Sequence, residues 1–148
     1  MKSKKSWERT NNRKESGGFF ALPASVLASS NFIRLTAKGV KLLVDMGAQY
    51  KGSNNGDLCA TWSMMEKRGW KSRSTLHEAL NELLHYGFII KTKQGGQHAP
   101  SLYAITWKKI DECGGKLEIK PTTAPLALWI SEKQPYIKAS SNKYRNSI

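Results

Sequence analysis

The densest group of side chains able to bind an anion is the run Ser72-Arg73-Ser74-Thr75. It combines hydroxyl groups with a guanidinium group, whose planar fork of N–H donors matches a phosphate or the edge of a guanine. Ser72 is also the expected N-cap of a helix, so unpaired backbone N–H groups and the positive end of the helix dipole would lie beside these side chains. The run therefore predicts a site for a polyanion.

Basic and polar side chains flank this run on both sides. They are Lys67, Arg68 and Lys71 before it, and His77 and Asn81 after it. The cations suit contacts with backbone phosphates, whereas a His or an Asn on the helix can reach base edges, where Asn favours adenine. Glu78 and Glu82 would repel phosphate, which predicts that only the first turns of the helix enter a DNA groove. Each flanking side chain also has a plainer interpretation as a solvated or capping group.

A second polar group is expected at the tip of a β-hairpin. Residues 88–92 and 102–107 contain the β-branched and aromatic residues typical of strands, and the loop between them contains Gly95-Gly96. The polar side chains near this tip are Lys91, Lys93, Gln94, Gln97 and His98. They would lie over a phosphate or a minor groove next to the site at Ser72.

Apolar periodicity predicts the elements that position these groups. Residues 76–86 form a predicted helix that Gly87 closes. Its core-facing stripe consists of Leu76, Ala79, Leu80, Leu83 and Leu84. Before it, Thr61 or Ser63 caps a short helix, with Gly69 as the left-handed terminator. The order is therefore helix, tight turn, helix and hairpin.

Two more helices are predicted in the N-terminal half. Residues 24–29 form a short helix that Ser30-Asn31 breaks, and Thr36 caps a helix over residues 36–50. Gly39 and Gly47 weaken the second helix by up to about 1 kcal/mol each relative to Ala. We therefore expect another element to approach it closely at these glycines.

This order of elements is that of a winged helix-turn-helix domain. Residues 70–90 resemble the recognition-helix-and-wing segment of bacterial winged-helix regulators, including the gluconate-repressor type, on the run Ser72-Arg73-Ser74-Thr75, the aliphatic stripe, Gly87 and the strand. Residues 19–107 are similar to small winged-helix proteins of bacterial plasmids, phages and integrated elements, some near replication functions. The resemblance implies an α+β fold, a helical core with a small antiparallel β-hairpin wing plus flexible basic tails, and double-stranded DNA as the partner.

The charge of the chain supports a polyanionic partner. Its 148 residues include 24 Lys and Arg against 11 Asp and Glu, which gives a formal net charge of +13. Residues 1–17 are predicted to be a basic flexible arm, and residues 18–120 the winged helix domain with a short strand at 116–120. Residues 121–148 are predicted to be a tail that is partly docked and then flexible.

Several classes of chemistry are not expected. Cys59 and Cys113 lie far apart and form no metal-ligand spacing with the histidines, so we expect reduced thiols, no metal and no cofactor. Neither a nuclease-like carboxylate cluster nor a Walker-type loop is present, so we do not expect an enzyme. No apolar run reaches the length of a membrane span and the charged N-terminus is unlike a signal peptide, so we expect a cytoplasmic, nucleoid-associated protein.

The leading hypothesis is a sequence-selective protein that binds double-stranded DNA and acts in transcription regulation or replication control. A homodimer would fit, because many such regulators read two half-sites. One alternative is a winged-helix module or replication accessory protein that binds a protein partner through apolar tail residues 126–130. Another is a single-stranded nucleic-acid binder in which Trp62, Trp70 and Trp107 stack on bases. Because these tryptophans lie at element boundaries, packing in the core or in turns is the favoured interpretation.

Overall fold

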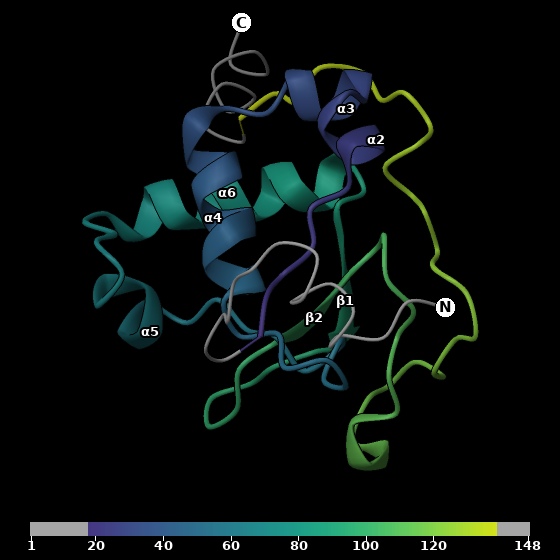
Figure 1. Ribbon diagram of the computed structural model, residues 1–148. Coiled ribbons are helices and arrows are strands. Elements are labelled where there is room, and N and C mark those ends of the chain that lie inside the picture. Colours follow the sequence, from purple (N-terminus) through teal and green to yellow (C-terminus); the bar gives the residue numbers. More distant parts are fainter. Residues whose placement is uncertain (1–17, 139–148) are drawn as a thin grey trace, which may run out of the picture.

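The computed structural model describes residues 18–138, which form a group of helices followed by a two-stranded antiparallel hairpin (Figure 1). In chain order the elements are α2 (Ala24–Leu27), α3 (Ser30–Ile33), α4 (Ala37–Gly47), α5 (Trp62–Glu66), α6 (Arg73–His85), β1 (Ile89–Lys93), β2 (Leu102–Ile105) and η1 (Cys113–Gly115). Helix α4 packs on α6, and α6 contacts β1. The predicted α+β class is therefore confirmed. The predicted arm at 1–17 and the predicted tail beyond residue 138 lie outside the described residues.

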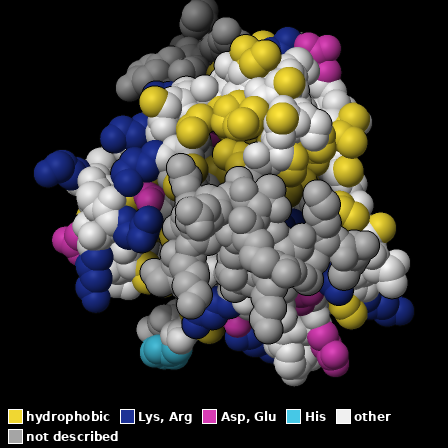
Figure 2. Space-filling model, viewed as in Figure 1, with side chains coloured by type: hydrophobic (Ala, Val, Ile, Leu, Met, Phe, Trp, Pro, Cys, Tyr) yellow, Lys and Arg dark blue, Asp and Glu magenta, His cyan; other side chains and the backbone are white. Residues whose placement is uncertain are grey.

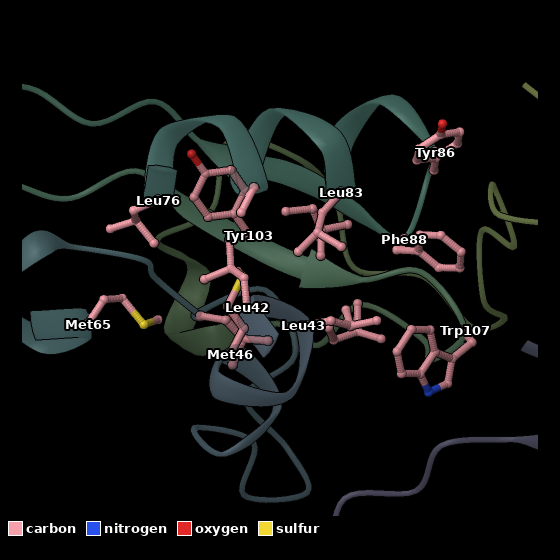
Figure 3. Close-up of a cluster of buried hydrophobic side chains, with 14 of the residues drawn as sticks. Leu42, Leu43, Met46, Met65, Leu76, Leu83, Tyr86, Phe88, Tyr103 and Trp107 are labelled. Atoms are coloured by element: carbon pink, nitrogen blue, oxygen red, sulfur yellow. The ribbon is translucent and has the colours of Figure 1, made fainter. Parts of the chain in front are cut away.

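The core lies between α4, α6 and the hairpin. Its central side chains are Leu42, Leu43 and Met46 from α4, Leu76 and Leu83 from α6, and Tyr103 from β2 (Figure 3). The stripe predicted along α6 is confirmed, because its members are either buried or packed against the core. Burying one such side chain stabilises the fold by about 1.5–3 kcal/mol, so this shared core holds α6 against α4.

The ends of α4, α5 and α6 follow local signals in the sequence. Thr36, Thr61 and Ser72 are the N-caps, and each side-chain oxygen accepts a hydrogen bond from a backbone N–H three residues further on. Gly69 and Gly87 adopt φ angles of +94° and +79°, a region that favours glycine. These predicted helix boundaries are confirmed, although α6 begins at Arg73, ahead of its apolar stripe.

The two glycines of α4 allow the close approach that was predicted. A Cβ atom on Gly47 would lie 2.5 Å from Cε1 of Phe20, and one on Gly39 would lie 3.0 Å from Oε1 of Glu82. The predicted extent of this helix to residue 50 is wrong, because α4 ends at Gly47. The chain leaves the helix where the side-chain amide of Gln49 pairs with the backbone of Cys59, donating at 2.7 Å and accepting at 3.0 Å.

The predicted helix break at Ser30-Asn31 is also wrong. Ser29 caps a second short helix, α3, which begins at Ser30, and the Ser29 hydroxyl oxygen accepts from the N–H of Phe32 at 3.2 Å. Asn31 lies inside α3 and is fully buried. Its side chain binds a distant part of the chain, and these contacts offset the low helix propensity of Asn.

Residues 129–138, here called the C-terminal strap, are the distant segment that Asn31 binds. The Asn31 amide donates to the carbonyl oxygens of Trp129 and Ser131, both at 2.8 Å, and accepts from the N–H of Lys133 at 3.0 Å. Further along, the N–H of Tyr136 donates to the Tyr86 hydroxyl at 2.9 Å. The strap therefore joins α3 to the C-terminal end of α6, and Figure 1 shows it in yellow beyond α3.

The hairpin is irregular at one position in β1. Lys91 pairs with Tyr103 and Lys93 pairs with Leu102, so the register shifts between Lys91 and Lys93. The intervening Thr92 is buried, and its hydroxyl donates to the carbonyl oxygen of Gly56 at 2.6 Å. The bulge thus turns one side chain inward and leaves its neighbours at the edge of the hairpin.

The predicted strand at 116–120 is wrong. This segment has one backbone hydrogen bond to the hairpin, from the N–H of Glu118 to the carbonyl oxygen of Thr92 at 2.9 Å. A strand needs a repeated ladder of such bonds, and Thr92 sits at the bulge, where the ladder is interrupted. A different residue pairs with the outer side of β2: Leu58 forms an isolated bridge with Tyr103.

Asn55 joins the loop after α4 to the end of the hairpin. Its buried side-chain amide donates to the carbonyl oxygens of Ile105 and Lys109 at 3.0 and 2.8 Å, and accepts from the N–H of Ile105 at 2.8 Å. Its own N–H donates to Asp111 at 2.8 Å. One polar side chain thus satisfies backbone groups that would otherwise be buried without partners.

We expect Asn55→Ala to lower the free energy of unfolding by about 3 kcal/mol or more, because each buried group left unsatisfied costs roughly 1–3 kcal/mol. Urea denaturation followed by circular dichroism measures the change. Ser53→Ala, at an exposed position of the same loop, is the control and should change stability by less than about 0.5 kcal/mol. Equal effects of the two substitutions would contradict this role for Asn55.

Candidate nucleic-acid interface

The N-terminal turn of α6 brings the predicted anion-binding run to the surface. The Ser72 hydroxyl oxygen accepts from the N–H of Thr75 at 3.3 Å and lies 2.9 Å from the Ser74 hydroxyl oxygen. Arg73 and Ser74 are exposed, whereas Ser72 and Thr75 are half-buried. Ser72 therefore caps the helix, and Ser74 presents its side chain to solvent beside it.

Arg73 is held over an aromatic ring of the preceding helix. Its guanidinium carbon lies 5.2 Å from the centre of the Trp62 ring, within the range of a cation–π contact. Trp62 itself is half-buried and packs against the core. The contact restricts the long Arg73 side chain to the surface between α5 and α6. This lowers the conformational entropy that the side chain would lose on binding a ligand.

The turn between α5 and α6 is bound to α4 through the carboxylate of Asp45. This buried group accepts from Trp70 Nε1 at 2.8 Å, Arg68 Nε at 2.9 Å and Lys41 Nζ at 3.0 Å. Lys41 Nζ also donates to the Arg68 carbonyl oxygen at 2.9 Å. Asp45 was not among the predicted site residues, because its one local signal is an acidic residue within an otherwise apolar stretch of helix.

The donors around Asp45 keep it charged. Burial raises the pKa of the Asp45 carboxyl, but the hydrogen bonds from Trp70, Lys41 and Arg68 outweigh burial and lower that pKa below its ordinary value. Arg68, predicted to contact phosphate, thus has an internal carboxylate partner, although its side chain is 44% exposed. Lys67 and Lys71 are exposed on either side of it.

The outer side of α6 is divided between solvent and the C-terminal strap. His77 is exposed. The Tyr136 hydroxyl of the strap donates to Glu78 Oε2 at 2.7 Å and also interacts with the Asn81 side chain. Nearer the end of the helix, His85 Nε2 lies 2.6 Å from the Gln134 carbonyl oxygen. The strap therefore occupies part of the surface on which Asn81 was predicted to reach a base edge.

Glu82, which was predicted to repel phosphate, is buried and lies against α4. Only 5% of this residue is exposed. Its Oε1 and Oε2 atoms accept from the N–H and the hydroxyl of Thr36 at 2.5 and 2.7 Å, respectively. Glu82 thus joins the middle of α6 to the N-cap of α4.

The predicted hairpin residues lie together at the end of β1 and in the loop after it. Lys91, Gln94, Gln97 and His98 are exposed, and Lys93 is half-buried. Lys91 Nζ donates to Gln94 Oε1 at 3.0 Å, and Gly96 and Ala99 form a bridge that narrows the loop. In Figure 1 this loop and the α5–α6 turn lie on the same side of the molecule.

Positive charge gathers on that side. Figure 2 shows Lys and Arg side chains along the left edge, over α5 and the start of α6. The exposed or half-buried cations of these segments and of neighbouring α4 are Lys38, Lys41, Lys67, Arg68, Lys71 and Arg73. Two of them, Lys38 and Lys41, lie 5.7 and 5.8 Å from the ring of buried Trp70. Lys38 and Lys41 were not among the predicted contacts, because they belong to a helix well before the recognised motif.

The favoured interpretation of the tryptophans as packing residues is confirmed. Trp70 and Trp107 are buried, with exposed fractions of 3% and 9%, and Trp62 is half-buried. The Trp70 indole N–H donates to Asp45, and the Trp107 indole N–H donates to the Ala21 carbonyl oxygen at 3.1 Å. Their rings are therefore not exposed platforms on which bases could stack.

Cys59 and Cys113 are free thiols, and burial raises the pKa of both. Among residues 18–138, no group of His, Cys, Asp and Glu side chains is arranged to hold a metal ion. No helix in the same residues has the length and apolarity needed to cross a bilayer. No protein-family model matches the chain, and neither a curated protein nor a solved structure shows detectable similarity to it.

We expect Asp45→Asn to lower the free energy of unfolding by about 1–3 kcal/mol at pH 7, because the donors lose a charged acceptor. Asp45 has a lowered folded-state pKa, so its contribution is present above pH about 4 and is lost as the pH falls through that lowered value. The difference in free energy of unfolding between wild type and variant should therefore become smaller only in acid. Urea denaturation across a pH series measures this difference.

Asp57→Asn is the matched control for this experiment. Asp57 pairs with Lys116 at 2.6 Å, but both side chains are about one-third to one-half exposed. A pair of this kind contributes less than about 1 kcal/mol. If the two substitutions had the same effect, the network around Asp45 would have no special role in stability.

Proposed function

We propose that the protein is a winged helix-turn-helix protein that binds double-stranded DNA. In this proposal α5 and α6 are the helix-turn-helix, the first turns of α6 enter the major groove, and the β1–β2 hairpin is the wing. The observation that supports it most is the exposed, basic start of α6 beside the α5–α6 turn, with the polar hairpin loop on the same side. The net charge of +13 supplies a general attraction for DNA.

The side chains divide into two kinds of contact. Arg73 has the donor fork for a guanine edge, and His77, one turn later, is exposed for a second base. Lys67 and Lys71 suit phosphates on either side of the groove, and the hairpin residues suit a phosphate or minor groove further along. Because Tyr136 contacts Glu78 and Asn81, base reading would be concentrated in the first two turns of α6.

The proposed role is transcription regulation or replication control in the bacterial cytoplasm. A homodimer that reads two half-sites is part of this proposal. The protein-interaction alternative has support in the exposed apolar side chains of Leu126, Leu128 and Ile130. The single-strand alternative is weakened by the burial of Trp70 and Trp107.

We expect the full chain to bind a fluorescent duplex with an affinity that falls steeply with salt. If about six phosphates are neutralised, the log–log slope should be near −5. The double variant Lys71→Ala with Arg73→Ala should lose at least about tenfold in affinity and show a shallower slope. Fluorescence anisotropy between about 50 and 300 mM salt measures both quantities.

Lys109→Ala is the control, because it removes one exposed cation outside the proposed interface. Duplex binding that ignores salt and survives the double substitution would reject the proposal. A single strand of the same sequence distinguishes the two nucleic-acid hypotheses. Tighter binding of the single strand, with tryptophan quenching, would favour stacking on bases.

Arg73→Lys tests sequence reading separately from charge. Lysine keeps the positive charge but lacks the bidentate fork, so affinity for random duplex should be nearly unchanged. Preference at one guanine position should fall by about 1–3 kcal/mol, or roughly 5- to 150-fold. Selection of bound duplexes from a random pool measures this change, and an unchanged motif would remove Arg73 from base recognition.

A further inference from the structure

A pocket of about 460 Å³ lies between the start of α4, the length of α6 from Ser74 to Tyr86, and the end of the C-terminal strap. Its lining includes Arg34 and Lys38 on one side, Ser74 and Thr75 on another, and Tyr136 and Lys138 from the strap. The volume is within the range of about 300–1,000 Å³ found for pockets that hold small molecules. It therefore has room for a phosphodiester group with part of its sugars.

The cations of this pocket come from three separate parts of the chain. Arg34 follows α3 and pairs with Glu132 of the strap at 2.8 Å. Lys38 lies in the first turn of α4 and is exposed, and Lys138 at the end of the strap is also exposed. The fold thus brings Lys38 and Lys138 to one pocket although 100 residues separate them in the sequence.

The two carboxylates in the pocket wall are both engaged by protein donors. Glu82 accepts two hydrogen bonds from Thr36, and Glu78 accepts one from the Tyr136 hydroxyl. Burial, with the hydrogen bond to and the charge of Glu78, raises the pKa of Tyr136 to about 12, so this hydroxyl remains a donor at neutral pH. Both carboxylates are therefore oriented by Thr36 and Tyr136, and among the described residues no salt bridge joins either of them to Lys38 or Lys138.

We propose that this pocket holds a backbone phosphate of bound duplex DNA, with Lys38 and Lys138 as its cations and the hydroxyls of Ser74 and Thr75 as donors. The proposal rests on the proposed function, because Ser74 and Thr75 belong to the helix start that enters the groove. A phosphodiester carries one negative charge and exposed acceptor oxygens, which match two ammonium groups and short hydroxyl donors. The strap is the element that completes the site, since it brings Lys138 to α6.

Charge removal at the two lysines tests the pocket in the full chain. We expect Lys38→Ala and Lys138→Ala each to weaken binding of a random duplex about three- to tenfold near 100 mM salt. Each single variant should reduce the log–log salt slope by less than about 0.9, because the other lysine still neutralises the phosphate, and the double variant should reduce it by about 0.9, the value for one phosphate. Lys120→Ala is the control, because this exposed lysine does not line the pocket.

The possible outcomes separate this inference from the proposed function. If Lys71 and Arg73 matter but Lys38 and Lys138 behave like Lys120, the inference fails and the proposed function stands. A reduction of the log–log salt slope by about 1.8 in the double variant would mean that the lysines contact separate phosphates. That result would also contradict the inference that they share one pocket. If wild type does not bind duplex at all, the proposed function itself fails.

Tyr136→Phe tests the strap without removing its aromatic ring. Loss of the hydroxyl frees the Glu78 carboxylate to turn toward the phosphate, so duplex affinity should fall about threefold or more. Adding Glu78→Gln should restore the affinity, because the charge that repels phosphate is gone. Glu78→Gln alone is the control, because losing a negative charge raises duplex affinity in any background. A purely structural role of Tyr136 predicts the same gain from Glu78→Gln in wild type and in Tyr136→Phe, and that result would overturn the role of the strap.

Discussion

The carboxylate of Asp45 holds the start of α6 in place relative to α4. One of its three donors, Lys41, belongs to α4, and the other two, Arg68 and Trp70, belong to the α5–α6 turn. Removing such a carboxylate from water is costly, and the charge-assisted hydrogen bonds offset that cost. Because all three donors must be in position together, the network selects one geometry of the turn. The exposed position of Arg73 and Ser74 depends on that geometry.

A second carboxylate performs the same task further along α6. Glu82 binds both the N–H and the hydroxyl of Thr36, so the N-cap of α4 is joined to the middle of α6. Gly39 lets the two helices approach at this point, since a Cβ atom there would be 3.0 Å from the carboxylate. Together with Asp45, this contact places acidic groups inside the helix pair. On the surface around the proposed interface the lysines and arginines then outnumber the remaining acidic side chains, Glu66 and Glu78, which favours a polyanion.

Features with short-range causes could be predicted from the sequence. An N-cap acts on an N–H group three residues away, and a left-handed glycine acts on its own helix, so Thr36, Ser72 and Gly87 were recognisable. The partners of Asn31 and Glu82 were not. Asn31 binds residues about 100 positions later and Glu82 binds one 46 positions earlier. Each looked like an ordinary polar residue on a helix, because nothing local in the sequence distinguishes a buried partner from a solvated side chain.

The strap and the proposed interface together limit how much sequence one copy can read. If α6 reads DNA as proposed, the contacts of Tyr136 with Glu78 and Asn81 would leave base recognition to Arg73, His77 and their immediate neighbours. A good bidentate contact contributes about 1–3 kcal/mol of discrimination, whereas specific binding in a genome needs roughly 4–10 kcal/mol over nonspecific binding. If α6 reads DNA as proposed, the difference has to come from the hairpin, from the shape of the DNA or from a second copy on a second half-site. A second copy on a second half-site would double the discrimination with the same few residues. With so few base-contacting residues in each copy, a two-fold symmetric DNA target is therefore the simplest expectation.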